Sequence, residues 1–421
     1  MNKKSTNKME LDFIASGPYQ AGIVLLITWV VILGIAKALK LEKHGFKITP
    51  YSLTYKNTQV QTALSKMLTR TKRGIRVFAD VSVIAGFLMM GYAFWFLFVN
   101  MANYFTEPTE FLAMMPIVPG VTVTSWEHIF AFLLAIPIVL VVHEGAHGIV
   151  ATLEKIKIKT GGVGVIIALF YGFVEPDEEE FDNAKKISKL RVIGAGATSN
   201  VIFAILLGAI MITNPVFGVI VTPLPAVGPV VGLFYESSNG MMVTSLIEGG
   251  GAEQAGIHAN DIIINVDSVK IITFMDLQKA DLKPGQKVDV TVLRDGQEIT
   301  FPVSIMASPD DPEQGLIGIM RDGGNDFKPI YNYIEWDLSN QIVGYVSLFL
   351  VWLWVISFFI GILNMLPLPI LDGGKFIHSI IYKKISEKSV NSIMIAIYAV
   401  TFILFVGNIA LTYVKEGWFT I

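Results

Sequence analysis

Six apolar runs, each long enough to cross a bilayer as a helix, are the feature that most constrains this chain. A transmembrane helix needs about 20 consecutive apolar residues. Of the 421 residues, 53% are hydrophobic and only 16% are charged, a composition more apolar than that of soluble domains. We therefore expect an α-helical polytopic membrane protein with about six transmembrane helices, at residues 19–39, 78–100, 127–151, 191–213, 341–366 and 391–414.

The basic residues predict the orientation of these helices. Residues 37–76 contain ten Lys and Arg, whereas residues 77–154 contain none. Further basic residues follow the third run and lie between the fifth and sixth runs. Short cytoplasmic loops carry such an excess of Lys and Arg. The pattern predicts that both termini, and the long polar segment between the fourth and fifth runs, lie outside the cytoplasm.

Two segments depart from the pattern of apolar helices. Residues 161–174 are apolar but too short and too rich in glycine to span as a helix, so we expect a re-entrant hairpin at about 161–175. Residues 225–320 alternate short apolar strands with glycine turns, and Asp295–Gly296 is typical of a hairpin turn. The predicted organisation is a first membrane part at 1–220, an extracytoplasmic β-rich domain at 225–320 and a second membrane part at 335–421.

The third run contains "VVHEGAHGIV", which places three ionisable groups where each is costly to bury. Residues four apart share one face of a helix, so His143 and His147 can both present an imidazole to one metal ion, with Glu144 beside it. In a zinc hydrolase one coordination position stays open for water, and the glutamate accepts a proton from that water. The alternatives are a chance match of the motif or histidines that only hydrogen-bond neighbouring helices.

The third ligand of a hydrolytic zinc site is expected to be Asp372. It follows the fifth run in "GILNMLPLPILDGGKF", and the charge pattern places it near the same membrane face as His143. Pro367 and Pro369 break the helix just before it, which lets an aspartate turn inward. The alternative is an ordinary prolyl turn that closes the span. The chain has no cysteine, so thiolate ligands and disulfides are excluded.

Together, the H-E-x-x-H motif, "NMLPLPILDGG" and the polar insert resemble the site-2 protease family of intramembrane zinc metalloproteases. The resemblance covers residues from about 127 to 385 and implies that His143, His147 and Asp372 hold one Zn²⁺ ion while Glu144 is the general base. The insert resembles a protease-associated PDZ domain, and "GFVEPDEEE" (172–180) resembles the family's stretch after a membrane-inserted hairpin.

Two asparagines complete the expected site. "GAGATSN" (194–200) resembles the family's small-residue motif that ends in asparagine, which places Asn200 near the zinc, and Asn364 belongs to the later motif. The resemblance implies that both bind the substrate, by orienting the scissile peptide or stabilising its developing oxyanion. Hydrogen bonds between helices are the alternative role for both amides.

The resemblance predicts a protease of regulated intramembrane proteolysis, which hydrolyses a peptide bond within or near the transmembrane helix of single-span membrane proteins. Another protease is expected to trim these substrates first. A prokaryotic plasma membrane is the expected location, with the active site toward the cytoplasm. The net charge of −3 gives no sign of a nucleic-acid partner. The competing classes are a metal or ion transporter, which would usually show internal repeats, and a catalytically silent membrane scaffold.

Overall fold

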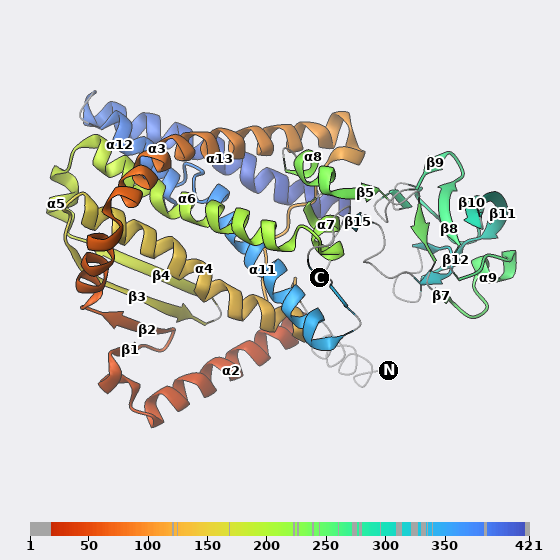
Figure 1. Ribbon diagram of the computed structural model, residues 1–421, viewed down its shortest axis with the longest axis horizontal. Helices are drawn as coiled ribbons and strands as arrows, with labels where there is room; N and C mark the ends of the chain where they lie inside the picture. Colours follow the sequence, from red (N-terminus) through yellow and green to blue (C-terminus); the bar gives the residue numbers. More distant parts are fainter. Residues whose placement is uncertain are drawn as a thin grey trace, which may run out of the picture. The chain divides into compact units, whose positions relative to one another are not determined.

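The chain divides into two compact units, one formed by Met1–Leu207 with Tyr345–Ile421 and the other by Gly208–Gly344. The computed structural model (Figure 1) describes residues 18–119, 122–123, 125–167, 169–221, 224, 227–237, 240–243, 245–259, 261–271, 276–277, 280–294, 296–308, 314–320, 327–329, 334, 336–338, 340–382 and 385–416. The inserted unit begins before the predicted boundary at 225, because the short helix α7 (Pro215–Val221) contacts strand β15 (Phe327–Pro329) of that unit.

Long helices build the first unit, as the apolar runs predict. Five of them are long and apolar enough to cross a membrane among the described residues. These are α3 (Val60–Thr106), α4 (Trp126–Leu153), α6 (Lys186–Met211), α11 (Gln341–Leu363) and α13 (Glu387–Glu416). The first predicted run is also helical, as α2 (Pro18–Ala38), but the total of six spans stays a prediction. The shorter helices of this unit are η1 (Leu41–His44), η2 (Pro108–Glu110), α5 (Glu178–Asn183) and α12 (Asp372–Ile381).

Helix α3 begins at Val60, well before the apolar run predicted at 78–100. At 1.5 Å per residue its 47 residues extend about 70 Å, more than twice the thickness of the hydrocarbon core. The additional turns are basic on their exposed sides, whereas Leu64, Leu68 and Ile75 pack in a core with α4. The helix therefore continues outside the apolar run because packing against α4 stabilises its amphipathic first half.

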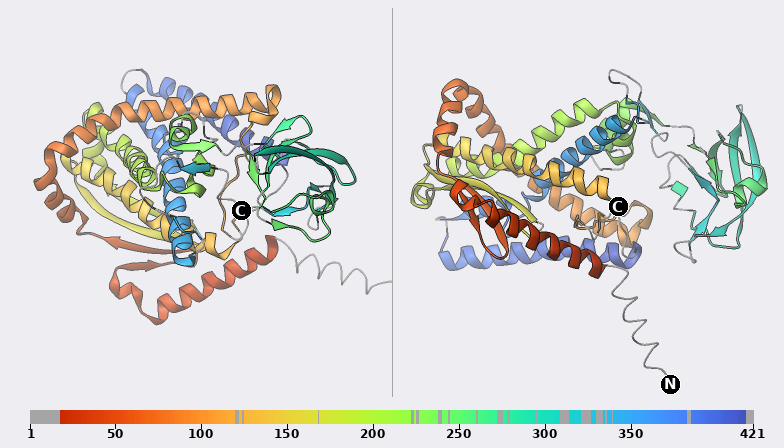
Figure 2. Two further views of the ribbon diagram at one scale, coloured as in Figure 1. Left: turned by 45° about the vertical axis from the view of Figure 1, so that its right-hand side comes forward. Right: turned by 90° about the horizontal axis from the view of Figure 1, so that it is seen from below.

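Four antiparallel strands form a sheet in the order β1 (Phe46–Ile48), β2 (Ser52–Asn57), β3 (Ile158–Ile166) and β4 (Leu169–Pro176). Strands β3 and β4 form a hairpin at the predicted position of about 161–175, and its re-entry into the membrane stays a prediction. Gly162 allows β2 to pair with this hairpin, because a Cβ there would lie 2.0 Å from the carbonyl oxygen of Tyr55. Strand β4 remains at the edge of the sheet and runs alongside α4 (Figures 1 and 2).

Helix α6 is packed closely between its neighbours. A Cβ at Gly194 would lie 2.5 Å from the Ser82 carbonyl oxygen of α3, and a Cβ at Gly361 of α11 would lie 3.1 Å from the Ala197 carbonyl oxygen. Small residues permit this approach, as is common between membrane helices. At the end of α4, the buried carboxylate of Glu154 accepts hydrogen bonds from Arg76 of α3 and Arg191 of α6. These contacts fix the three helices against one another.

The inserted unit is a small β-rich domain, as predicted. Its five-stranded sheet contains β11 (Gln297–Ser304), β10 (Lys287–Arg294), β8 (Ile262–Val266) and β6 (Met241–Met242) in that order, with β9 (Val269–Lys270) paired to β8. The β10–β11 hairpin agrees with the predicted turn, of which Asp295 lies outside the described residues. The other elements are α8 (Gly228–Val231), η3 (Gly232–Phe234), β5 (Tyr235–Ser237), β7 (Ser245–Leu246), α9 (Gly251–Ala255), β12 (Met306–Ala307), β13 (Gly315–Leu316) and β14 (Ile319–Met320).

An ion pair connects the end of β10 to the turn before β8. Arg294 donates from Nε and Nη2 to the two carboxylate oxygens of Asp261, at 2.7 and 2.6 Å, and Asp261 is only 2% exposed. Burial raises the pKa of Asp261, but the hydrogen bonds from Arg294 and from the backbone N–H of His258 outweigh it, so the pKa lies below its ordinary value.

Replacing Arg294 by glutamine is expected to destabilise the inserted domain by about 3 kcal/mol at neutral pH, because it leaves a buried carboxylate without its cation. Since the folded-state pKa of Asp261 is lowered, the ion pair stabilises above the unfolded-state pKa and is lost as the pH falls through the folded-state value. Hydrogen exchange of residues 262–266 and 287–294 in the full chain measures this effect. The control is Lys283→Gln, whose pair with Asp281 is exposed and should change exchange little.

Candidate metal centre

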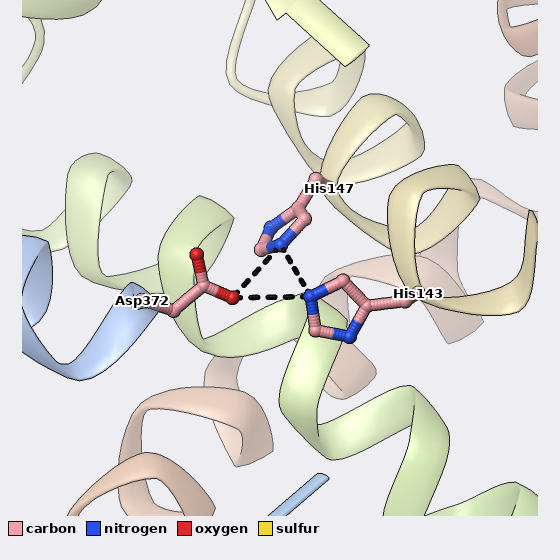
Figure 3. A group of neighbouring side chains, drawn as sticks. All are labelled: His143, His147 and Asp372. Atoms are coloured by element: carbon pink, nitrogen blue, oxygen red, sulfur yellow. Dashed lines mark hydrogen bonds and ion pairs between the residues drawn. The ribbon is translucent and has the colours of Figure 1, made fainter. Parts of the chain in front are cut away.

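His143, His147 and Asp372 point their ligand atoms at one another inside the helix bundle (Figure 3). Nε2 of each histidine lies 3.1 Å from Oδ2 of Asp372, and the two Nε2 atoms are 3.2 Å apart. His143 is 3% exposed and Asp372 8%. The structure therefore brings together the three residues that the sequence analysis predicts as ligands.

The backbone explains how residues so far apart in the sequence meet. The two histidines lie one turn apart on α4, and Asp372 is the first residue of α12. The turn from α11 into α12 is tight: the Gly373 N–H donates to the Asn364 carbonyl at 2.8 Å. A Cβ at Gly373 would lie 2.1 Å from the Met365 carbonyl oxygen, so only glycine fits after the aspartate. The proline break and the two glycines thus aim Asp372 toward α4.

The donor set fits a zinc ion. Two imidazole nitrogens and a carboxylate oxygen are typical zinc ligands, and at bond lengths of about 2.0–2.1 Å a tetrahedral ion holds them about 3.3 Å apart. The separations of 3.1–3.2 Å are close to that value. A Cβ on Gly196 of α6 would lie 2.3 Å from Nε2 of His147 and 2.7 Å from Nε2 of His143. Glycine at this position leaves space beside the ligand atoms.

Hydrogen bonds orient both imidazoles. Nδ1 of His147 lies 2.7 Å from the Val192 carbonyl oxygen, so the ring N–H donates there and Nε2 is available for a metal. For His143, Nδ2 of Asn200 lies 3.0 Å from Nδ1 and Nδ2 of Asn364 lies 3.1 Å from Nε2. Both predicted asparagines thus contact a ligand histidine, and their predicted contacts with substrate stay predictions.

Glu144 lies on α4 next to His143, and its carboxylate is held by the hairpin. Oε2 accepts a hydrogen bond from the Val174 N–H of β4 at 2.9 Å. A Cβ at Gly172 would lie 2.8 Å from Cγ of Glu144, so β4 approaches this closely only with glycine there. Gly172, Gly196 and the backbone groups of Val174 and Val192 cannot be identified as site groups from the sequence. The glycines near these residues in the sequence are a sign of close packing but not of a partner, because backbone N–H and C=O groups occur at every residue.

Comparison with known proteins agrees with this geometry. The profile of Peptidase family M50 matches residues 131–406, more than half of the chain. A protein of Methanocaldococcus jannaschii is 24% identical over 361 residues, covering 83% of this chain and 82% of that protein. A protein of Clostridium perfringens named "Putative zinc metalloprotease" is 24% identical over 358 residues, covering 70% of this chain and 99% of that protein.

Two further matches are shorter. The "Serine endoprotease DegS" of Escherichia coli is 36% identical over 72 residues, which cover 17% of this chain and 20% of that protein. The PDZ domain of the SdrC-like protein from Listeria monocytogenes matches 20% of this chain and 90% of that domain, at 18% identity and a TM-score of 0.19.

The family profile includes both histidines and Asp372, so the sequence match and the ligand geometry concern the same residues. It also includes long apolar helices on both sides of the inserted domain, as expected for an integral membrane protein. The predicted resemblance to site-2 proteases is confirmed, and this zinc metalloprotease belongs to Peptidase family M50.

Proposed function

We propose that this peptidase hydrolyses a peptide bond within or near the transmembrane helix of single-span membrane proteins, as part of regulated intramembrane proteolysis. The observation that carries the proposal is the His143–His147–Asp372 cluster, whose two histidines lie on the apolar helix α4 and whose aspartate begins α12. A carboxylate is held next to this cluster by an edge strand. Ionisable groups inside apolar helices are costly and are usually functional. A site of this kind is suited to substrates that are themselves in the bilayer.

Each residue of the site has a chemical role. His143, His147 and Asp372 hold the zinc ion, which when bound supplies Lewis acidity to the scissile carbonyl and to water. Glu144 accepts a proton from the attacking water while the water oxygen bonds to the carbonyl carbon of the peptide. Glu144 then donates that proton to the amide nitrogen as the C–N bond breaks. The products are a carboxylic acid, which keeps the other proton of the water, and an amine. We propose that the amide of Asn364, whose Nδ2 lies 3.1 Å from Nε2 of His143, binds a substrate oxygen.

The edge strand offers a way to present the peptide. A transmembrane helix hides its carbonyl groups in its own hydrogen bonds, so a substrate must unwind locally before it is cleaved. Strand β4 ends the described sheet, and its Val174 N–H points away from β3, toward Glu144. We propose that the unwound segment pairs with this edge as an additional strand, which places its backbone next to the general base.

The excess of basic residues in the loops between the apolar runs suggests how the protein is oriented in the membrane. We propose that the active site lies toward the cytoplasmic side of a prokaryotic plasma membrane and that the inserted PDZ-like domain is extracytoplasmic. In that position the domain meets the outer part of a substrate first. It either binds the new end left by a first protease or excludes untrimmed substrates by size. Both roles make prior trimming a condition for cleavage.

The test uses the purified full chain in lipid vesicles with a single-span substrate, either intact or without its extracytoplasmic domain. We expect cleavage of the trimmed substrate alone, at a bond that mass spectrometry maps within or near the apolar run. A zinc chelator should abolish it and added zinc should restore it. The matched variants are His143→Ala, expected to be inactive, and His128→Ala at the other end of α4, expected to be active. Cleavage confined to soluble loops, or activity that persists after chelation, would contradict the proposal.

A further inference from the structure

The imidazole of His143 lies between two asparagine amides that occupy opposite sides of the ring. Asn200 is at Nδ1, 3.0 Å away, and Asn364 is at Nε2, 3.1 Å away. Nε2 is also the atom that faces His147 and Asp372. One amide is therefore on the metal side of the ring and the other is on the far side. This difference in position implies a difference in role.

The tautomer that His143 needs to bind a metal determines which group Asn200 must present to Nδ1. A neutral imidazole that gives the lone pair of Nε2 to a cation carries its proton on Nδ1, and a buried N–H requires an acceptor. Metal-binding histidines usually donate this second N–H to a carboxylate or a carbonyl, which fixes the tautomer and the ring orientation. At Nδ1 of His143 the group in that position is the amide of Asn200.

The amide itself points to the same conclusion. Asn200 is 0% exposed, and its Oδ1 has no hydrogen-bond partner among the described residues. The structure places Nδ2 against Nδ1 of His143, which would put two donors face to face once the ring carries its proton there. Turning the amide by half a turn about Cβ–Cγ exchanges its oxygen and nitrogen. The oxygen then accepts from the Nδ1–H, and the buried acceptor has its partner.

The other ligand histidine has the same arrangement with a different acceptor. Nδ1 of His147 donates to the Val192 carbonyl oxygen at 2.7 Å. Val192, Gly196 and Asn200 are spaced by four residues and lie on one face of α6. The described ligand atoms come from α4 and α12. Helix α6 instead supplies a polar partner for each imidazole, and Gly196, between these two partners in sequence, leaves space beside the ligand atoms.

We propose that Asn200 is a positioning residue: its side-chain oxygen holds His143 with the proton on Nδ1, so that Nε2 is free to bind zinc. This role replaces the contact with substrate that the family resemblance implies for Asn200, and it leaves Asn364 as the amide that faces the substrate. The proposal rests on the zinc centre described above. It concerns how the metal is held, whatever peptide is cleaved.

Zinc affinity separates the two roles without a substrate. The full chain in detergent is titrated with zinc against a chelator of known affinity, for the parent and for Asn200→Leu, Asn200→Asp and Asn364→Leu. We expect Asn200→Leu to bind zinc about 10–100-fold more weakly, the usual cost of losing such a partner. Asn200→Asp keeps an acceptor in place and should bind like the parent. Asn364→Leu should also keep parent affinity but lose turnover.

Two results would overturn the proposal. One is parent zinc affinity in Asn200→Leu. The other is Asn200→Asp losing affinity as much as Asn200→Leu, since the acceptor would then have no effect. Asn200→Asp has nearly the same shape as the parent, so this arm stays informative if the leucine variant does not fold. A parent chain that binds zinc but cleaves no membrane substrate contradicts the proposed function alone. A parent chain that binds no zinc contradicts both.

Discussion

Replacing Glu144 by glutamine is expected to slow proteolysis by about 10²–10⁴-fold, the usual contribution of a general base, without removing the metal. Glutamine has nearly the same shape, and its side-chain carbonyl can still accept the hydrogen bond from the Val174 N–H. It cannot take a proton from water, so the loss is confined to the chemical step. Elemental analysis for zinc, together with kcat on a trimmed single-span substrate, measures the two effects separately.

The matched control for this variant is Glu127→Gln, which changes an exposed carboxylate in the first turn of the same helix. We expect it to cleave at the parent rate. A Glu144→Gln chain that also cleaves at the parent rate would remove Glu144 from the mechanism. A chain that loses zinc would assign Glu144 to metal binding instead, and the proton acceptor would have to be sought elsewhere.

The ligand set could be predicted because its signals are local. The spacing of four puts His143 and His147 on one face of any helix. Ionisable groups in an apolar run are costly and therefore indicate a functional site. Asp372 required one more step, the estimate of depth from the basic residues, and the proline break before it supplied a physical reason for an inward turn. Helix positions followed from the same apolar runs, apart from the amphipathic beginning of α3.

The sheet and the α6 face could not be predicted in the same way. Strands β1 and β2 are short, and the pairing of β2 with β3 joins segments about 100 positions apart, which no local pattern encodes. The acceptor for His147 is a backbone carbonyl of Val192, and the hydrogen bond to Glu144 comes from the backbone of Val174. Such groups exist at every residue, so only the fold selects them. The sequence shows Gly196 as one of several small residues and does not indicate that it lies against the two histidines.

Adding one methyl group at that position is expected to remove the metal. In Gly196→Ala the new Cβ would lie 2.3 Å from Nε2 of His147 and 2.7 Å from Nε2 of His143, far inside van der Waals contact. Helix α6 cannot retreat easily, because Gly194 is already against the Ser82 carbonyl and Ala197 against Gly361. The histidines must therefore turn away, and we expect zinc affinity to fall by more than about 100-fold, beyond the cost of losing an outer partner.

Titration with zinc against a chelator measures this loss, and proteolysis should disappear with it. The control is Gly145→Ala, between the two histidines in sequence, where an added Cβ meets nothing within 4 Å. This variant makes the same chemical change to a helix of the same site and should bind zinc like the parent. If Gly196→Ala also bound zinc with parent affinity, the ion could not lie among the three ligand atoms as they are placed, since the methyl group would share its space. The contrast between the two alanines therefore tests the position of the metal itself, independently of any substrate.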